Sequence, residues 1–434
     1  MLCAMGGEAI FPPALSFGLS PMYKLLSASS VTRWALYALL IFTPLARASV
    51  QGWAVTTIHL VTLIALASFL VENSFAWNWK WIETPLDKPI LILIILSILA
   101  TVFSMHKYTS IWSTILLFNY IIIYYLIIHT VRTRSQFRQL LYIIIGVGVF
   151  LSIFGFFKLI GVNPFPWWEY TDIRQSNLRL ASTYGNADHL AGYMEMAIPL
   201  ILGLLLTGYR NVKIIFIICL AFFMFLAIVL SFSRGGWLGL GTGLGFMTIA
   251  LLTDSRRDIK LTLATLIGGT LILLFIALSS TPVVERLRTL ELKGEIPNLK
   301  SRVSRWRGTV EMIRDYPLLG TGPGTFAIVF TQYQPPGYAN RSFYAHNDYL
   351  HFISEIGLSL TVVIVWMIIA LYRRGFKKLK NPSRLVRGIT IGGMAGITAI
   401  LVHSIGDFNL NIPTNAILFT ILGALVVAPL PIDN

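Results

Sequence analysis

Residues 214–232 read IIFIICLAFFMFLAIVLSF and contain no charged side chain. A helix needs about 20 mainly apolar residues to cross the hydrocarbon core of a membrane, so this stretch predicts a membrane-spanning helix. About twelve such runs follow one another along the chain. They lie near 32–49, 53–71, 88–105, 111–130, 139–161, 187–207, 214–232, 236–252, 261–279, 349–372, 387–404 and 413–430. The run at 187–207 is the weakest of them, because it contains His189, Glu195 and Pro199.

The composition of the whole chain agrees with this pattern. Of 434 residues, 56% are hydrophobic and 12% are charged, whereas a soluble domain carries about 25% charged residues. These values exclude a soluble enzyme, a disordered chain and a fibrous protein, and they predict an all-α polytopic membrane protein. A membrane β-barrel would show short alternating segments instead. Two cysteines, Cys3 and Cys219, cannot form a disulfide framework, and we expect Cys219 to be a buried thiol.

The distribution of Lys and Arg predicts the orientation of the spans. Four basic connections fall on one side of a twelve-span arrangement, at 132–138, 210–213, 256–260 and 373–387. Short basic connections stay in the cytoplasm, so this side is cytoplasmic and both termini share it. The net charge of +15 would suggest nucleic acid in a soluble protein. Here the basic residues orient helices, and we expect no nucleic-acid partner.

The predicted organisation has four parts. An N-terminal tail, 1–30, precedes nine spans in 31–279, a large outer loop at 280–348 and three further spans in 349–434. The outer loop carries nine basic and six acidic residues, and loops of this length escape the positive-inside rule. Its basic residues cluster at Lys300, Arg302, Arg305 and Arg307. The loop is therefore either an ordinary solvated segment or, as the cluster favours, a docking site for an anion.

The first half of the outer loop predicts an amphipathic helix on the outer membrane surface. Arg302, Trp306, Val310 and Ile313 fall at helical spacing, and Arg305 shares a face with Arg302. We expect Pro317 to end the helix and the glycines of 320–324 to form a tight turn. No strand precedes this turn, as one does in phosphate-binding loops, so a bend is favoured over a phosphate cradle.

The segment FYAHNDYLHFISEIGLSL, 343–360, leads into an apolar run. Asn347 or Asp348 can cap the helix, which places His346 at its outer end. A helix N-terminus disfavours an imidazolium, so we expect His346 to be neutral near pH 7, as a general base must be. The alternative is a structural histidine bonded to a loop carbonyl. For the deeper His351 and Glu355 we expect packing or supporting hydrogen bonds.

Arg234 lies where two spans meet on the outer side. Burying an arginine near hydrocarbon costs on the order of 3 kcal/mol, so an arginine here is either functional or a snorkelling anchor. The glycines of 235–245 are expected to be helix-packing contacts.

Other outer connections carry Arg179 with Asp188 and His189, and His403 with Asp407. These carboxylates can orient a base, pair with an arginine or simply be hydrated. The sequence contains no D-x-D or similar cluster. We therefore expect no metal and assign any phosphate charge to arginines.

Four motifs in order resemble the O-antigen ligase and polymerase family. They are SRGGW (233–237), R-x-x-x-W (302–306), DYPLLGTGPGTF (315–326) and HNDYLHFISEIG (346–357). The resemblance implies a glycosyltransferase-C-like helical architecture in the bacterial inner membrane, with part of the active site in a large periplasmic loop. It also implies a glycan donor on undecaprenyl pyrophosphate and no cofactor. The acceptor is lipid A–core oligosaccharide in ligases or a second lipid-linked glycan in polymerases.

The family's functional residues map onto these motifs. Its loop histidine matches His346, its two arginines match Arg234 and Arg302 with Arg305 as a near competitor, and a late carboxylate matches Asp407. The expected site has His346 and Asp407 as catalytic residues, Arg234, Arg302, Arg305 and Arg179 on the pyrophosphate, and Asn347 and Asp348 in support.

These residues predict a metal-independent, inverting glycosyltransferase of the O-antigen ligase type. A polysaccharide polymerase with the same site is the nearest alternative, and a protein O-glycosyltransferase is a further one. A transporter for an anionic lipid-linked glycan would also suit twelve spans with outer arginines, but midplane charges are sparse.

Overall fold

The computed structural model describes residues 28–74, 80–164, 179–205, 212–252, 297–334 and 341–429. Helices fill most of these ranges, and no strand occurs within them. The all-helical prediction is confirmed for this part of the chain. The expected span at 261–279 and most of the N-terminal tail lie outside the described residues.

Each expected span up to residue 252 coincides with one helix. These helices are α2 (Ala28–Leu45), α3 (Gly52–Ser74), α4 (Asp87–Val102), α5 (Lys107–Thr130), α6 (Arg134–Leu159), α7 (Ala187–Leu205), α8 (Val212–Leu230) and α9 (Arg234–Leu252). The later helices are α12 (Pro297–Asp315), α13 (Phe326–Val329), α14 (Asp348–Ile356), α15 (Ser359–Leu379), α16 (Arg384–His403) and α17 (Pro413–Val427).

Six of the described helices are long and apolar enough to cross a membrane, namely α3, α5, α6, α9, α15 and α16. Three more, α2, α8 and α17, are apolar but shorter. This supports a polytopic membrane protein, and the number of twelve spans stays a prediction.

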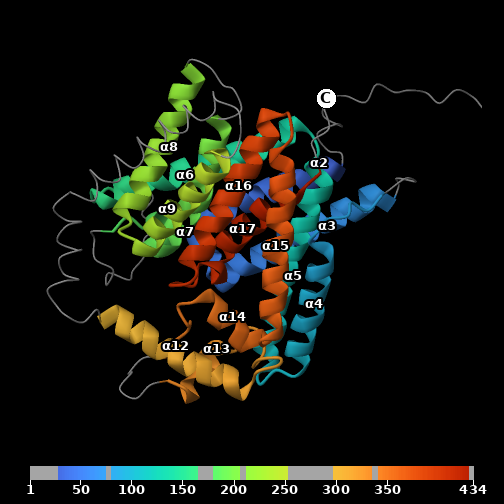
Figure 1. The fold of residues 1–434 in the computed structure, drawn as a ribbon, viewed down its shortest axis with the longest axis vertical. Coiled ribbons are helices and arrows are strands. Elements are labelled where there is room, and N and C mark those ends of the chain that lie inside the picture. The colour runs from blue at the N-terminus through green and yellow to red at the C-terminus, as the bar shows by residue number, and fades with distance from the viewer. Residues whose placement is uncertain are drawn as a thin grey trace, which may run out of the picture.

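The centre of the helix bundle is α16, which packs against α7 and α9 (Figure 1). Glycines allow this close approach. A methyl group built onto Gly243 of α9 would lie 2.6 Å from the Ala395 carbonyl oxygen of α16. One built onto Gly396 of α16 would lie 2.6 Å from the Met196 carbonyl oxygen of α7. The predicted packing role is confirmed for Gly243, whereas Gly241 has open space beside it.

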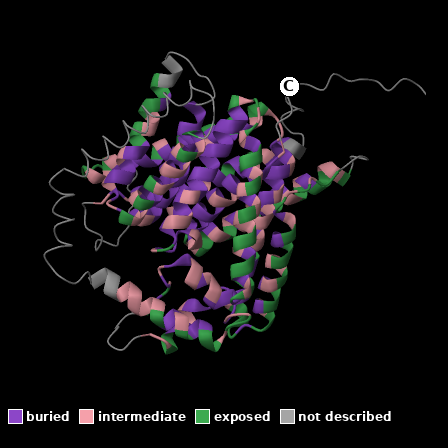
Figure 2. Cartoon of the chain, in the orientation of Figure 1, coloured by how far each residue is buried: buried purple, intermediate pink, exposed green. Residues whose placement is uncertain are grey.

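The helices α12, α13 and α14 form an outer unit, residues 297–334 and 341–356. It lies below the bundle in Figure 1, beside the lower ends of α4, α5 and α15. It has a small hydrophobic core of its own, made by Met312, Phe326, Val329, Phe330 and Ala345. Figure 2 shows this as a small group of buried residues apart from the large buried interior of the bundle. The helix predicted from the spacing of Arg302 to Ile313 is confirmed as α12, which ends before Pro317.

The glycine-rich turn after α12 wraps around the end of α14. Both oxygens of the buried Glu355 carboxylate accept backbone N–H groups of this turn, from Gly324 at 2.8 Å and from Phe326 at 3.0 Å. The Thr321 N–H donates to the Ser354 carbonyl oxygen, and the Gly322 N–H to that of Glu355. These amides are therefore occupied within the protein. The turn is a bend, as predicted, and not an open phosphate cradle.

Two sequence predictions are wrong. Residues 349–372 are not one helix, because the chain breaks at Gly357, where φ is 95°. That left-handed conformation suits glycine, and it separates α14 in the outer unit from the apolar helix α15. Cys219 is exposed, not buried. It lies on α8 beside the exposed Ile215 and Phe216, on a face that packs against no other described helix.

We predict that Glu355→Ala destabilises the outer unit. Truncation leaves two buried N–H groups without acceptors, and each buried donor left unsatisfied costs about 1–3 kcal/mol. Thermal unfolding of the purified protein in detergent should show a clearly lower Tm than the wild type. Glu311→Ala, at an exposed position on α12, is the matched control. An unchanged Tm for Glu355→Ala would contradict the anchoring role.

Candidate functional site

His346 lies in the loop that leads from the outer unit's core into α14. Its backbone φ is 53°, a left-handed conformation that is strained for a residue with a side chain. Trp306 of α12 holds this strained backbone, because its Nε1–H donates to the His346 carbonyl oxygen at 3.2 Å. Asn347 follows as the cap of α14 and accepts the Leu350 N–H at 3.0 Å. Strained residues held in this way cluster at functional sites.

Asp407, in the connection between α16 and α17, faces the imidazole of His346. Its Oδ1 lies 3.3 Å from the His346 Nδ1 and also accepts the Phe408 N–H at 2.9 Å. Phe408 in turn packs edge-to-face against the His346 ring. Burial acts to raise the pKa of Asp407, but the hydrogen bond with His346 and the nearby histidines, His189 and His403 among them, hold it well below its usual range. The carboxylate is therefore ionised at neutral pH.

Asp348 joins the outer unit to the bundle. Its buried carboxylate accepts the Ser404 hydroxyl at 2.8 Å, the Leu410 N–H at 2.9 Å and the Asn411 side-chain amide at 2.7 Å. Its own N–H donates to the carbonyl oxygens of Ser404 and Asp407. Burial raises the pKa of Asp348 to about 7, while these three hydrogen bonds act to lower it. The hydrogen bonds fix the loop that carries His346 against the connection that carries Asp407.

The two arginines of α12 differ in their surroundings. Arg305 folds back on its own helix, where its Nε and Nη2 bind the carbonyl and the hydroxyl of Ser301. Arg302 is half-buried, and within the described part of the chain its guanidinium has no hydrogen bond or ion pair. A methyl group built onto Gly406 would lie 3.8 Å from the Arg302 Nη1. The guanidinium of Arg302 therefore lies next to the residue that precedes Asp407.

The remaining predicted arginines border this site. The Arg179 Nη2 pairs with the Asp188 Oδ1 at 2.7 Å, and its Nε donates to the Ser231 carbonyl oxygen at the end of α8. Arg179 thus links the start of α7 to the end of α8. Arg234 is exposed at the first residue of α9. The next residue, Gly235, packs against the His403 ring.

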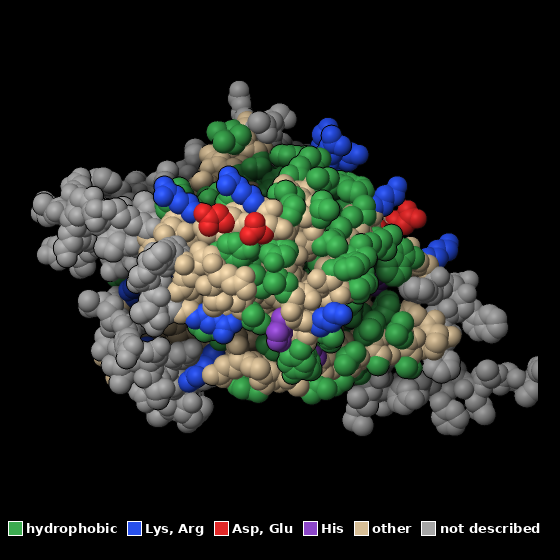
Figure 3. Space-filling view, turned by 90° about the horizontal axis from the view of Figure 1, so that it is seen from below, with side chains coloured by type: hydrophobic (Ala, Val, Ile, Leu, Met, Phe, Trp, Pro, Cys, Tyr) green, Lys and Arg blue, Asp and Glu red, His purple; other side chains and the backbone are tan. Residues whose placement is uncertain are grey.

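Figure 3 views the molecule from the side of the outer unit. Lys and Arg side chains lie in several separate places between hydrophobic and neutral side chains. The described part of this face shows no dense basic patch.

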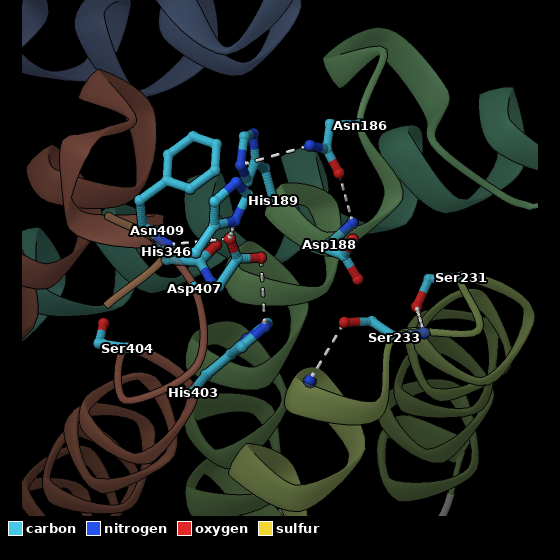
Figure 4. Close-up of polar contacts among 12 residues, drawn as sticks. Asn186, Asp188, His189, Ser231, Ser233, His346, His403, Ser404, Asp407 and Asn409 are labelled. Carbon is cyan, nitrogen blue, oxygen red and sulfur yellow. Dashed lines mark hydrogen bonds and ion pairs between the residues drawn. The ribbon is translucent and has the colours of Figure 1, made fainter. Parts of the chain in front are cut away.

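The sequence did not predict a buried partner below Asp407. His403 and Glu195 form an ion pair inside the bundle, with 3.0 Å between Nδ1 and Oε1. The His403 Nε2 lies 3.9 Å from the Asp407 Oδ2. Figure 4 shows His346 and His403 directed at Asp407 from opposite sides. The available signal was an ionisable residue, Glu195, inside an apolar run, which is a reason to suspect function.

The assembled site combines two chemical capabilities. His346 has its Nδ1 directed at a carboxylate and a partly exposed side chain, and its Nε2 has no hydrogen-bond partner among the described residues. An imidazole held in this way can take a proton at Nε2. The guanidinium of Arg302 can bind an oxyanion through bidentate hydrogen bonds. The described residues contain no group of three or more His, Cys, Asp or Glu side chains placed to hold a metal.

Comparison with known proteins places this site in a family context. The family model described as O-antigen ligase matches residues 219–365, about a third of the chain. All four sequence motifs lie inside the matched segment, so the resemblance to the O-antigen ligase and polymerase family is confirmed. The match supports an enzyme of this general type. No curated protein matches the chain.

We predict that Asp348→Ala loosens the contact between the outer unit and the bundle. Leaving the buried donors that bind Asp348 without an acceptor costs about 1–3 kcal/mol, which corresponds to a roughly 5–150-fold increase in local opening. Hydrogen exchange read by mass spectrometry should show faster exchange in peptides covering 341–350 and 404–411. Asp348→Asn should have a smaller effect, and Glu83→Ala, at an exposed position before α4, none. Unchanged exchange in Asp348→Ala would contradict the joining role.

Proposed function

We propose that this chain is a glycosyltransferase of the O-antigen ligase type. It moves a glycan from undecaprenyl pyrophosphate to a hydroxyl of lipid A–core oligosaccharide, on the periplasmic face of the bacterial inner membrane. The observation that supports the proposal is the position of the Arg302 guanidinium, which has no hydrogen bond or ion pair among the described residues, next to Gly406, the neighbour of Asp407 in the His346–Asp407 pair. The site thus offers an anion-binding group, Arg302, and a proton acceptor, His346. Both residues lie inside the segment that the family model matches.

His346 is the proposed general base. Asp407 holds the proton of the imidazole on Nδ1, which leaves the lone pair of Nε2 directed at the acceptor. The acceptor O–H gives its proton to Nε2 as the oxygen bonds to C1 of the donor sugar. The imidazolium that forms is stabilised by the ionised Asp407 carboxylate.

The leaving group is the lipid diphosphate. As the bond between C1 and the phosphate oxygen breaks, its electron pair remains on the diphosphate, and Arg302 binds the charge that develops. Attack from the face opposite the diphosphate inverts the configuration at C1. We assign a second contact with the diphosphate to Arg234, which is exposed at the N-terminus of α9. Arg179 and Arg305 already bind other groups of the protein, so we assign them a supporting role.

The membrane accounts for the position of the donor's prenyl tail and for the side that the site faces. The prenyl tail would lie against the apolar helices, whose exposed faces carry residues such as Leu91, Ile95 and Val362. The Lys and Arg residues of the short connections predict cytoplasmic termini for twelve spans, and with that orientation the site faces the periplasm. No metal is needed, because arginine supplies the positive charge that the diphosphate requires.

Purified protein in detergent, supplied with lipid-linked donor and acceptor, tests the proposal directly. Release of undecaprenyl pyrophosphate together with a glycosylated acceptor is the expected result. A transporter would release none, and that outcome would overturn the proposal.

Deletion of the gene in its native cell separates ligase from polymerase. A ligase defect leaves lipid-linked polymer unattached, so long lipid-linked chains should accumulate. Accumulation of single lipid-linked repeat units would assign polymerase activity instead.

We predict that His346→Ala lowers turnover by about 10²–10⁴-fold, the usual contribution of a general base. Binding of the lipid diphosphate should be retained, because the arginines are unchanged. Turnover is measured by release of undecaprenyl pyrophosphate, and binding by its quenching of tryptophan fluorescence. His351→Ala, at a buried histidine of the outer unit, is the control for the loss of an imidazole. Wild-type turnover in folded His346→Ala would remove the base assignment.

We predict that Arg302→Lys and Arg305→Lys behave differently. Lysine keeps the charge but loses the planar fork, so Arg302→Lys should reduce kcat/KM for the donor by about 10²–10³-fold, by analogy with loss of an oxyanion donor. Arg305→Lys serves as the matched control on the same helix and should have a much smaller effect. Equal losses in the two variants would contradict the assignment of Arg302.

A further inference from the structure

We propose that Glu195 and His403 are positioning residues, which hold Asp407 in the orientation that serves His346. This inference rests on the proposed function. Together the four side chains form a line of alternating carboxylates and imidazoles that begins inside the bundle and ends at the partly exposed His346. Glu195, His403 and Asp407 all lie outside the segment that the family model matches.

The pair of Glu195 and His403 is enclosed by three helices. Glu195 of α7 and His403 of α16 are both buried, with side-chain exposures of 0% and 2%. The third helix, α9, presents glycines to them. A methyl group on Gly235 would meet the His403 ring, and one on Gly239 would meet the Glu195 Oε2. Side chains larger than glycine would displace the pair, so α9 is shaped around it.

The outer half of the line is the contact of His403 with Asp407. His403 uses Nδ1 for Glu195 and turns Nε2 toward the Asp407 Oδ2, at 3.9 Å. The other oxygen of Asp407 faces the His346 Nδ1 at 3.3 Å. Asp407 thus lies between two imidazoles, and its approach to His403 is longer than a hydrogen bond. Because the ring of His403 is fixed by Glu195, the direction of the Asp407 carboxylate depends on a residue on α7.

A purely structural role explains this arrangement poorly. A buried ion pair is weak evidence for stability, since apolar residues of similar volume often serve as well. The Glu195 Oε2 also has no hydrogen-bond partner among the described atoms, which is unfavourable for folding. A positioning role accounts for the retention of two buried polar groups at this place. Glu195 fixes the His403 ring, and the ring directs Nε2 toward one oxygen of Asp407.

The double variant Glu195→Gln with His403→Gln tests the proposal. It removes both charges together and keeps hydrogen-bonding groups of similar size, so no buried charge is left unpaired. We expect kcat to fall by about 10–100-fold, by analogy with removal of the hydrogen-bond partner of a metal-binding histidine. The donor KM should stay within about twofold of the wild-type value, because Arg302 is untouched. The matched control is His59→Gln, which alters another polar pair between helices, that of His59 with Asn119.

A second measurement does not depend on turnover. Diethyl pyrocarbonate modifies uncharged, accessible imidazoles, and mass spectrometry gives the rate at His346 in each folded variant. Without the His403 ring to orient Asp407, the His346 imidazole loses a fixed partner at Nδ1, so its rate of modification in the folded double variant should differ several-fold from that of the wild type. Glu195→Asp, which keeps the charge, should react more like the wild type.

The outcomes separate the two proposals. Wild-type kcat and wild-type His346 reactivity in the folded double variant would overturn the positioning role. A wild-type protein that releases no undecaprenyl pyrophosphate would overturn the proposed function, and the reactivity of His346 would still decide whether Glu195 and His403 act on it.

Discussion

The buried carboxylate of Asp348 is the contact on which the site depends. The outer unit has its own small core, and the bundle has another, so neither needs the other in order to be compact. Asp348 joins them through three accepted hydrogen bonds and two donated ones. Asp348 lies two residues after His346, and on the opposing connection its N–H donates to the carbonyl oxygen of Asp407 itself. Displacement of either element would separate the imidazole from its carboxylate.

The surroundings of each charged group explain how the arginines and acids divide their roles. Arg179 and Arg305 have hydrogen-bonding partners within the protein, and these fix local structure. Arg302 is half-buried and has none among the described residues, so its binding capacity is available to a ligand. The carboxylates divide in the same way. Glu355 and Asp348 bind backbone amides and hold elements together, whereas Asp407 faces histidines on two sides.

Much of this architecture could be predicted from the sequence, because it follows from local patterns. Apolar runs gave the helices of the bundle, helical spacing gave α12, and the Asn347 cap placed His346 at the start of α14. The break at Gly357 was missed, since an apolar run does not show where one glycine adopts a left-handed backbone. The pair of Glu195 and His403 was also missed. These residues are 208 positions apart in the chain, and only the packing of α7, α9 and α16 brings them together. The choice between Arg302 and Arg305 likewise depended on a side-chain contact with Ser301.

The central claim is that one diphosphate site lies where the outer unit meets the bundle. An electron cryo-microscopy structure in a lipid nanodisc with undecaprenyl pyrophosphate bound tests this most directly. Phosphate oxygens within about 3 Å of the Arg302 guanidinium, on the same side of the bundle as the open edge of His346, are the expected result. A diphosphate bound at the opposite end of the bundle, with Arg302 turned away from it, would contradict the account.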